Sequence, residues 1–447
     1  MKKRNIPRAS IVSIVIIASI VAIPSASAQK QWTLHECTEY AVSHNLQIKQ
    51  KDNQRRQQEL QLSTAKNSRL PDLSGSIGES LSFGRGLTMD NTYTNRSTSN
   101  TSFSLGTSVP LFTGFQIPNN IKLNQLNLEA VTQDLEKAKD DIRMQVAQAY
   151  VQILYDMELA DVADRQVEID SMQVARLEAF LQNGKASGAE VSQQKATLAQ
   201  SQLTSTQAQN NLQLSLLALT QLLELPTPEG FSVIRPAVGL AAPMLLPSPD
   251  AIYADALTFK PEVKAEQLRL DATEKSIKIA QSALYPTLSL NGGLQTNYYT
   301  TSGMPSESFS SQLKNNFSQY IGLSLNIPIF NRFSTRNSIR SARIDRENQQ
   351  LQLDNVKKAL YKEIQQVYYN AVAARAKYES SEVARQSSLD AFTLTQAKYE
   401  NGKANITEFN EAKNRYLKAE SDLVQARYEY MYQNALVDFY RGKELSF

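Results

Sequence analysis

The chain is poor in the residues that build most reactive sites. Its 447 residues include one cysteine, Cys37, and two histidines, His35 and His44. A single cysteine excludes a disulfide framework and any zinc or iron–sulfur centre built on cysteine ligands. Two histidines on one short segment supply too few ligands for a copper or zinc site and little material for a histidine base. We therefore expect no enzyme activity, no catalytic residues, no cofactor and no metal. We expect the histidines at ordinary helix positions and Cys37 as a small buried apolar side chain.

The chain also lacks an excess of one charge. Lysine and arginine number 47 against 44 aspartates and glutamates, which gives a formal net charge of +3. This balance provides no basic surface of the kind that nucleic acids need. The length fits two or three ordinary domains, or one elongated domain.

The first 28 residues have the pattern of a cleaved export signal. Four basic residues precede an apolar stretch from Ile11 to Ile23, and small residues follow at Ala26-Ser27-Ala28. The apolar stretch has about 13 residues, whereas a membrane-spanning helix needs about 20. We therefore predict a signal peptide over 1–28 and a mature chain that begins at Gln29.

The rest of the sequence consists of two similar halves. Ala65–Pro71 resembles Ala280–Pro286 at an offset of 215, and Asn183–Ala186 recurs identically as Asn401–Ala404 at an offset of 218. Such internal similarity is typical of a duplicated structural unit. We predict the following divisions: a first repeat over 29–225, a proline-rich linker over 226–250, a second repeat over 251–442 and a tail over 443–447.

Scarce glycine and proline predict very long helices. Neither residue occurs between Pro118 and Gly184 or between Pro328 and Gly402, and each segment would form roughly 100 Å of helix. Two further arms without glycine or proline, 189–225 and 403–441, follow the turns. Apolar residues at heptad spacing favour antiparallel coiled-coil hairpins with a core at this seam. The seam of the second half is Leu353, Val356, Leu360, Ile364, Val367, Ala371 and Ala374.

Four segments alternate as strands do. The pattern is clear in 103–111 and 321–329 and weaker in 73–83 and 287–295, and the non-apolar face carries serine, asparagine and glycine. Strands of roughly ten residues with one apolar face are typical of outer-membrane barrels, although a soluble sheet packed on a helix is the alternative. Four strands cannot close a barrel, so two chains would supply 8 strands and three would supply 12. We expect the polar segments 84–100 and 296–317 to be external loops.

These features together resemble the TolC family of outer-membrane efflux channels. The segments Ala41–Ile48, Ala256–Val263 and Ala283–Ser289 are similar to that family's patterns, and the resemblance covers essentially the whole mature chain. It implies a mainly α fold with a small β part, in which three chains share a 12-stranded barrel in the Gram-negative outer membrane. The long helical hairpins would continue that barrel as a tunnel across the periplasm.

The resemblance also implies a function. It indicates a homotrimeric exit duct of a tripartite efflux or type I secretion system, which conducts substrates passively and opens by an iris-like untwisting of helices. Its partners would be a periplasmic adaptor (membrane fusion) protein, an inner-membrane pump of RND or ABC type, and outer-membrane lipid, with no nucleic acid. The rival hypotheses are an exported coiled-coil spacer or adhesin without a pore, and the periplasmic adaptor itself.

The two turns between the long helices are candidate contact sites. A glycine after a helix end can adopt the left-handed conformation that terminates the helix. The resemblance implies that these periplasmic tips also touch the adaptor. The residues concerned are Asn183, Gly184, Lys185, Asn401, Gly402 and Lys403.

Acidic residues just beyond the turns are candidate constriction residues. Glu408 and Glu411 occupy the positions at which the family carries two aspartates that line the closed end of the pore. A ring of such acids would hold the pore narrow and cation-selective. Capping is the competing interpretation, because Asn405–Glu408 and Ser187–Glu190 fit the helix-start pattern. Capping accounts for Glu190 and Glu408 but not for Glu411. Ala404 stands where the family has an arginine-like partner.

Overall fold

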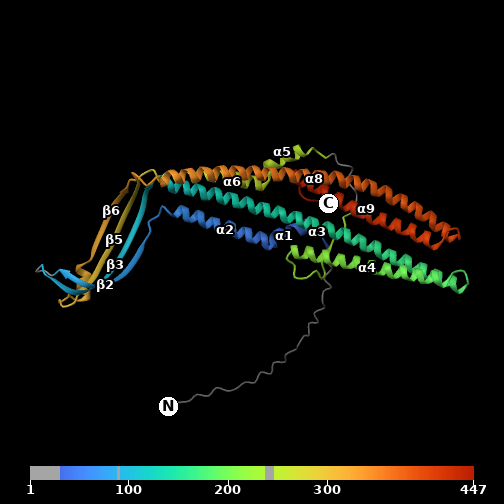
Figure 1. Ribbon diagram of the computed structural model, residues 1–447, viewed down its shortest axis with the longest axis horizontal. Helices are drawn as coiled ribbons and strands as arrows, with labels where there is room; N and C mark the ends of the chain where they lie inside the picture. Colours follow the sequence, from blue (N-terminus) through green and yellow to red (C-terminus); the bar gives the residue numbers. More distant parts are fainter. Residues whose placement is uncertain (1–30, 88–90, 237–245, 447) are drawn as a thin grey trace, which may run out of the picture.

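The computed structural model describes residues 31–87, 91–236 and 246–446, and in it the chain is elongated, with a β-sheet at one end and long helices filling the rest (Figure 1). The predicted signal peptide, 1–28, and part of the predicted linker lie outside these residues. The elements of the first half are β1 (Gln31–Trp32), α1 (Leu34–His44), α2 (Leu46–Asn67), β2 (Ser74–Leu87), β3 (Tyr93–Thr113), α3 (Gln116–Gln182), α4 (Gly188–Leu222) and β4 (Ser232–Val233). Those of the second half are α5 (Pro249–Phe259), α6 (Pro261–Ser282), β5 (Thr287–Thr301), α7 (Phe309–Asn315), β6 (Ser318–Asn326), α8 (Ser334–Glu400) and α9 (Ile406–Tyr440).

The two halves repeat the same order of elements, as the sequence indicates. Each has a pair of short helices, two long strands, a helix of 67 residues and a helix of 35 residues. The pairs of short helices are divided at Asn45 and Lys260, which are related by the offset of 215. Among the described residues, α7 has no counterpart in the first half, and the two-residue strands β1 and β4 have none in the second. The mainly helical fold with four long strands is confirmed.

The four long strands form one antiparallel sheet in the order β2-β3-β5-β6. Ile77 lies opposite Phe103, Leu105 opposite Leu294 and Leu290 opposite Leu323, so apolar side chains from all four strands share one face. The other face carries mainly serine, asparagine and glycine. A register shift between Pro110 and Phe112 changes this alternation at the end of β3.

The strands differ in extent from the prediction. Residues 84–87, 93–100 and 296–301 were expected in loops but extend the strands. Their sequences are polar, yet the ladder continues through Arg85 opposite Asn95 and Tyr93 opposite Leu87, so the backbone groups there pair with a neighbouring strand. The prediction of a strand through 329 was also wrong, because β6 ends at Asn326, the last residue paired with β5. Pro328, which has no N–H to donate, follows shortly after.

The helices form a curved layer. Next to the sheet, α3 packs against α2 on one side and α6 on the other, and α6 packs against α8. Farther away, α3 contacts α4 and α9, and α9 packs against α8 (Figure 1). No helix in the described part of the chain combines the length and the apolar character required to cross a membrane.

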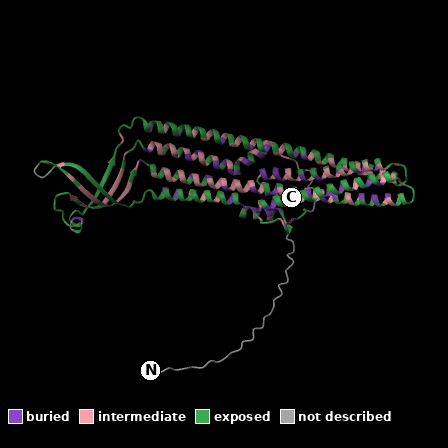
Figure 2. Ribbon diagram, turned by 60° about the horizontal axis from the view of Figure 1, so that its bottom comes forward, coloured by how far each residue is buried: buried purple, intermediate pink, exposed green. Residues whose placement is uncertain are grey.

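The buried core lies among the helices, whereas the sheet is largely exposed (Figure 2). The predicted seam is buried at Leu353, Leu360 and Ile364, as expected. However, this cluster is completed mainly by Ile252, Ala256, Val263 and Leu270 of α5 and α6. The expectation that the seam joins the two arms of one hairpin is therefore only partly right. Because α9 is shorter than α8, it does not reach the first part of α8, which packs against α5 and α6 instead. Cys37 is fully buried, as predicted.

Candidate functional site

The turns between the long helices have the predicted glycine geometry. Gly184 has a φ of 67°, and Gly402 has a φ of 69°. In the first turn the Lys185 N–H donates to the Phe180 carbonyl over 2.8 Å, and the Gly184 N–H donates to the Leu181 carbonyl over 3.0 Å. These two hydrogen bonds together form the Schellman motif, and the same pair of hydrogen bonds recurs around Gly402. The six predicted tip residues therefore end α3 and α8, and those at the apex are exposed.

Glu190 caps the helix that leaves the first turn. The Ser187 N–H donates to its carboxylate over 2.7 Å, and the Glu190 N–H donates back to the Ser187 hydroxyl over 3.2 Å. These two bonds form a capping box at the start of α4. The hydrogen bonds from Ser187 lower the pKa of the Glu190 carboxyl.

Glu408 has a similar local role at the start of α9. Its N–H donates to the Asn405 side-chain oxygen over 2.9 Å, and the Asn405 amide donates to its carboxylate over 2.9 Å. Both groups remain exposed, as does Glu411 one turn later. The capping interpretation is thus correct for Glu190 and Glu408. Whether Glu408, Glu411 or Glu190 lines a constriction depends on neighbouring chains and stays a prediction.

The buried side of α9 faces α8 as well as the other hairpin: Phe409 packs against Phe392 and Tyr399 of α8, whereas Lys413 reaches α3. Phe409, Ala412, Lys413 and Ala419 are buried and follow one side of the helix. At about 100° per residue, Glu411 lies about 200° from Lys413 around the axis, and Glu408 lies about 140° from it. The two acids therefore point away from Lys413 and its partner on α3, although Glu408 lies next to the buried Ala412 and Ala419 around the helix.

Sequence analysis missed a buried ion pair behind these acids. The Lys413 ammonium of α9 contacts the Asp170 carboxylate of α3, and their side chains are 1% and 0% exposed. Each residue interrupts an apolar helical pattern, Asp170 between Ala163 and Val174 and Lys413 between Phe409 and Ala419. A charge at a position with apolar spacing was the available signal, but neither partner could be identified from spacing alone.

Further polar contacts join the two hairpins along α3. The Gln173 amide donates to the Tyr399 hydroxyl over 2.8 Å. Glu158 accepts from Arg427 and, over 2.9 Å, from the Tyr428 hydroxyl. Burial and the nearby charge of Glu158 raise the pKa of Tyr428 to about 12. Polar contacts therefore connect the two hairpins of one chain at several points along the length of α3.

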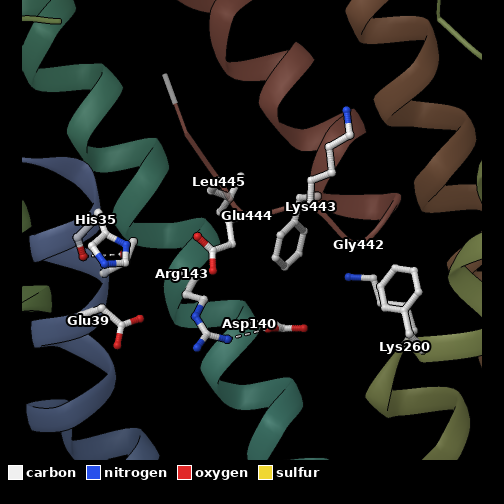
Figure 3. A pocket seen from close by; sticks show the side chains of 12 residues that line it. His35, Glu39, Asp140, Arg143, Lys260, Gly442, Lys443, Glu444 and Leu445 are labelled. Atoms are coloured by element: carbon white, nitrogen blue, oxygen red, sulfur yellow. Dashed lines mark hydrogen bonds and ion pairs between the residues drawn. The ribbon is translucent and has the colours of Figure 1, made fainter.

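A pocket of about 280 Å³ lies where the short helices meet the end of α9 (Figure 3). It is lined by His35, Glu39, Asp140, Arg143 and Lys260, with the segment 442–445 across it. Acidic and basic side chains both line it, and Asp140 pairs with Arg143 over 3.0 Å. Because the positive and negative charges balance, the pocket favours neither anionic nor cationic ligands.

Lys260 at this pocket is a structural cation. It is 3% exposed, and its ammonium lies 4.2 Å from the Phe439 ring centre and 4.5 Å from that of Tyr440. Burial lowers the pKa of Lys260 and raises that of Asp140. His44, the second histidine, stacks on Tyr40 at 3.9 Å. Within the described ranges, no three potential metal-ligating side chains come together.

Comparisons with known proteins agree with this geometry. The family profile described as outer membrane efflux protein matches residues 39–224 and 252–441, which correspond to the two repeats. The fusaric acid resistance protein FusA of Burkholderia cepacia is 28% identical over 51% of this chain and 43% of its own length. The outer membrane efflux protein BepC of Brucella suis is 24% identical over 71% of this chain and 65% of its own. The matches thus span less than two thirds of these relatives.

The fold is shared with a solved channel. The CmeC outer membrane channel of Campylobacter jejuni superposes with a TM-score of 0.76 at 18% identity, over 93% of this chain and 87% of that one. At this identity the similarity concerns the fold.

Proposed function

Because this chain belongs to the outer membrane efflux protein family, we propose that it is the exit duct of a tripartite efflux or type I secretion machine. It resides in the Gram-negative outer membrane with a periplasmic extension, and it conducts substrates passively. A periplasmic adaptor and an inner-membrane pump of RND or ABC type deliver the cargo and the energy. Residues 1–28 are the export signal, and 29–225 and 251–442 are the two repeats that build the duct.

The observation that carries this proposal is a layer with two open borders. In the described chain, β2 and β6 are the outer strands of the sheet, and each pairs on one side only. The helical layer has matching borders, with α2 and α4 at one and α8 at the other (Figure 1). One border of a copy can therefore pack against the opposite border of the next copy. Such head-to-tail contacts close into a ring when the rotation between copies is right.

The two faces of the sheet suit lipid and water. On the apolar face, Ile77 and Phe83 are each 75% exposed and Ile321 is 79% exposed. Exposing these apolar side chains to water would cost free energy, whereas the hydrocarbon region of a membrane accommodates them. The opposite serine- and asparagine-rich face suits a water-filled lumen. Open strand edges are not tolerated in lipid, so closure requires further copies. The family resemblance selects three, which makes a barrel of 12 strands.

The candidate residues are assigned roles within this duct. The tips around Gly184 and Gly402 are the adaptor contacts. Glu408 and Glu411, with Glu190, form the periplasmic constriction. The spacer or adhesin hypothesis leaves the exposed apolar face of the sheet without a purpose, and no observation favours it.

Conductance measurements on the reconstituted protein test this proposal. We expect the full chain, purified from outer membranes in detergent, to be a trimer and to give ion-conducting steps in planar lipid bilayers. A folded trimer that inserts into the bilayer but passes no ions, at any voltage and with purified adaptor added, would exclude a duct.

A further inference from the structure

The helix that carries Glu408 and Glu411 is fixed to the other hairpin by a polar network centred on the fully buried Asp170–Lys413 pair. The Lys413 ammonium and the Gln194 amide both donate to one oxygen of Asp170, the latter over 3.1 Å. The Ser201 hydroxyl and the Gln166 amide donate to the other oxygen, each over 2.5 Å. Three helices, α3, α4 and α9, therefore meet at one carboxylate.

The network also reaches α9 at a second point. The Asn410 amide of α9 donates to the Gln194 side-chain oxygen over 3.3 Å. Gln194 is itself fully buried, and it binds Asp170 with its other end. Asn410 and Lys413 lie about one turn apart on α9. Asn410 binds Gln194 of α4 and Lys413 binds Asp170 of α3, so α9 is held to both helices.

A buried ion pair of this kind fixes geometry more than it adds stability. Desolvation offsets most of the attraction between the charges, and well-packed apolar pairs are often equally stable. Removing one partner alone is strongly unfavourable, because an unpaired charge stays buried. The pair therefore accepts one arrangement of α9 and penalises rotations that would withdraw Lys413 from Asp170. Apolar contacts such as that of Ala412 are less directional and would tolerate a partial rotation.

We propose that Lys413 is a positioning residue that fixes the rotation of α9 about its own axis and thereby presents Glu408 and Glu411 to the pore. Lys413 points into the hairpin interface, and the acids lie about 140° and 200° away around the helix. As long as Lys413 is bound to Asp170, the carboxylates stay on the side of α9 that points away from α3. This inference rests on the proposed function as a conducting duct.

A surface pair between the same two helices provides a matched control. Arg165 of α3 and Glu420 of α9 approach to 3.5 Å, but their side chains are 56% and 19% exposed. A pair that is partly open to solvent constrains a helix more weakly than a fully buried one. R165Q/E420Q removes one ion pair between α3 and α9 without touching the buried network.

The test compares reversal potentials in a salt gradient across planar bilayers. The test variant is D170N/K413M, which neutralises both partners and leaves no unpaired charge. We expect its cation-over-anion permeability ratio to fall by about threefold, because the acid ring sets this preference. R165Q/E420Q keeps the ratio of the unaltered protein. In an E408Q/E411Q background, D170N/K413M changes the ratio no further, which distinguishes positioning from a general loosening of the duct.

Each outcome of this test has a defined meaning. An unaltered protein that does not conduct contradicts the proposed function, not the role of Lys413. A conducting D170N/K413M trimer with an unchanged ratio overturns the positioning role, and so does an equal change in R165Q/E420Q. If D170N/K413M does not form trimers, D170N/K413A, which also leaves no unpaired charge and removes the contact between the two positions, replaces it. The same ratios then decide.

Discussion

Single residues at the hairpin tips are tied to backbone conformations that few side chains adopt. The left-handed φ values of Gly184 and Gly402 end the two longest helices. A side chain at these positions would meet no neighbouring atom within 4 Å, so the cost of replacing them is conformational rather than steric. The turns therefore depend on glycine itself and not on the packing around it.

We predict that Gly184→Ala and Gly402→Ala each destabilise their hairpin by about 1–2 kcal/mol, the cost of a left-handed L-residue. Gly188→Ala is the control, because Gly188 begins α4 with an ordinary φ and open space around it. The measurement is the denaturant midpoint of the helical signal. Equal midpoints for Gly184→Ala and Gly188→Ala would contradict the role of the turn geometry.

The carboxyl of Glu190 gives the start of α4 a dependence on pH. Hydrogen bonds from Ser187 lower its pKa in the folded protein. Its stabilising effect is therefore complete above the unfolded pKa of about 4.3 and is lost as the pH falls through the lower, folded value. We predict that amide exchange protection in the first turn of α4 decreases over this acidic range.

The matched variants for this prediction are Glu190→Gln and Glu168→Gln. Glu190→Gln should remove the acidic decrease in protection, because a glutamine does not titrate. Glu168 is an exposed carboxylate on α3, so Glu168→Gln should leave the acidic decrease in protection unchanged. Hydrogen exchange corrected for intrinsic rates provides the measurement, and the same pH profile in all three proteins would refute the assignment.

At the scale of elements, α9 combines a helix start with a candidate constriction. The first turn is capped through Asn405 and Glu408, whereas Glu411 lies outside the cap. The capping role can therefore be tested at Asn405 and the constriction role at Glu411, because each residue takes part in only one of the two.

We predict that E408Q/E411Q raises single-channel conductance and lowers cation preference, because the acid ring is neutralised. Asn405→Ala removes the cap acceptor, and we expect it to cost about 1 kcal/mol of stability while ion preference is retained. Bilayer recordings together with thermal unfolding separate the two effects. Unchanged conductance in E408Q/E411Q would leave capping as the whole role of Glu408.

The elements also show which sequence signals are reliable. Alternation located all four strands, but it ended β2 too early, started β3 too late and ended β5 too early, because polar residues such as Asn95 and Thr98 continue the ladder. The strand edges are set by pairing across the sheet, which a local pattern does not record. Likewise, the heptad seam of α8 identified core residues but not α5 and α6, which cover most of it.

At the scale of the whole molecule, the hairpin tips lie at the end opposite the sheet (Figure 1). A chain whose sheet lies in the outer membrane would therefore extend its tips toward the inner membrane. Both tips are exposed and carry a lysine, Lys185 in one and Lys403 in the other.

We predict that a photo-crosslinking residue at Lys185 or Lys403 captures a periplasmic adaptor in cells, identified by mass spectrometry. Lys51, exposed on α2 and distant from the tips, is the control position. Capture from both tips and not from position 51 is the expected result, since only the tips face the pump. Clean outer-membrane expression with no adaptor captured would contradict the tip assignment.

The sequence by itself determined the repeat, the long helices, the alternating strands, the glycine turns and the capping of Glu190 and Glu408. All of these depend on residues close together in the chain, where spacing and backbone preference act directly. The tertiary structure alone decided the strand order, the two open borders, the partners of the α8 seam and the Asp170–Lys413 pair. These features join residues up to 243 positions apart. Such contacts depend on how helices pack in space, because burial and the pairing of charges are properties of the assembled fold.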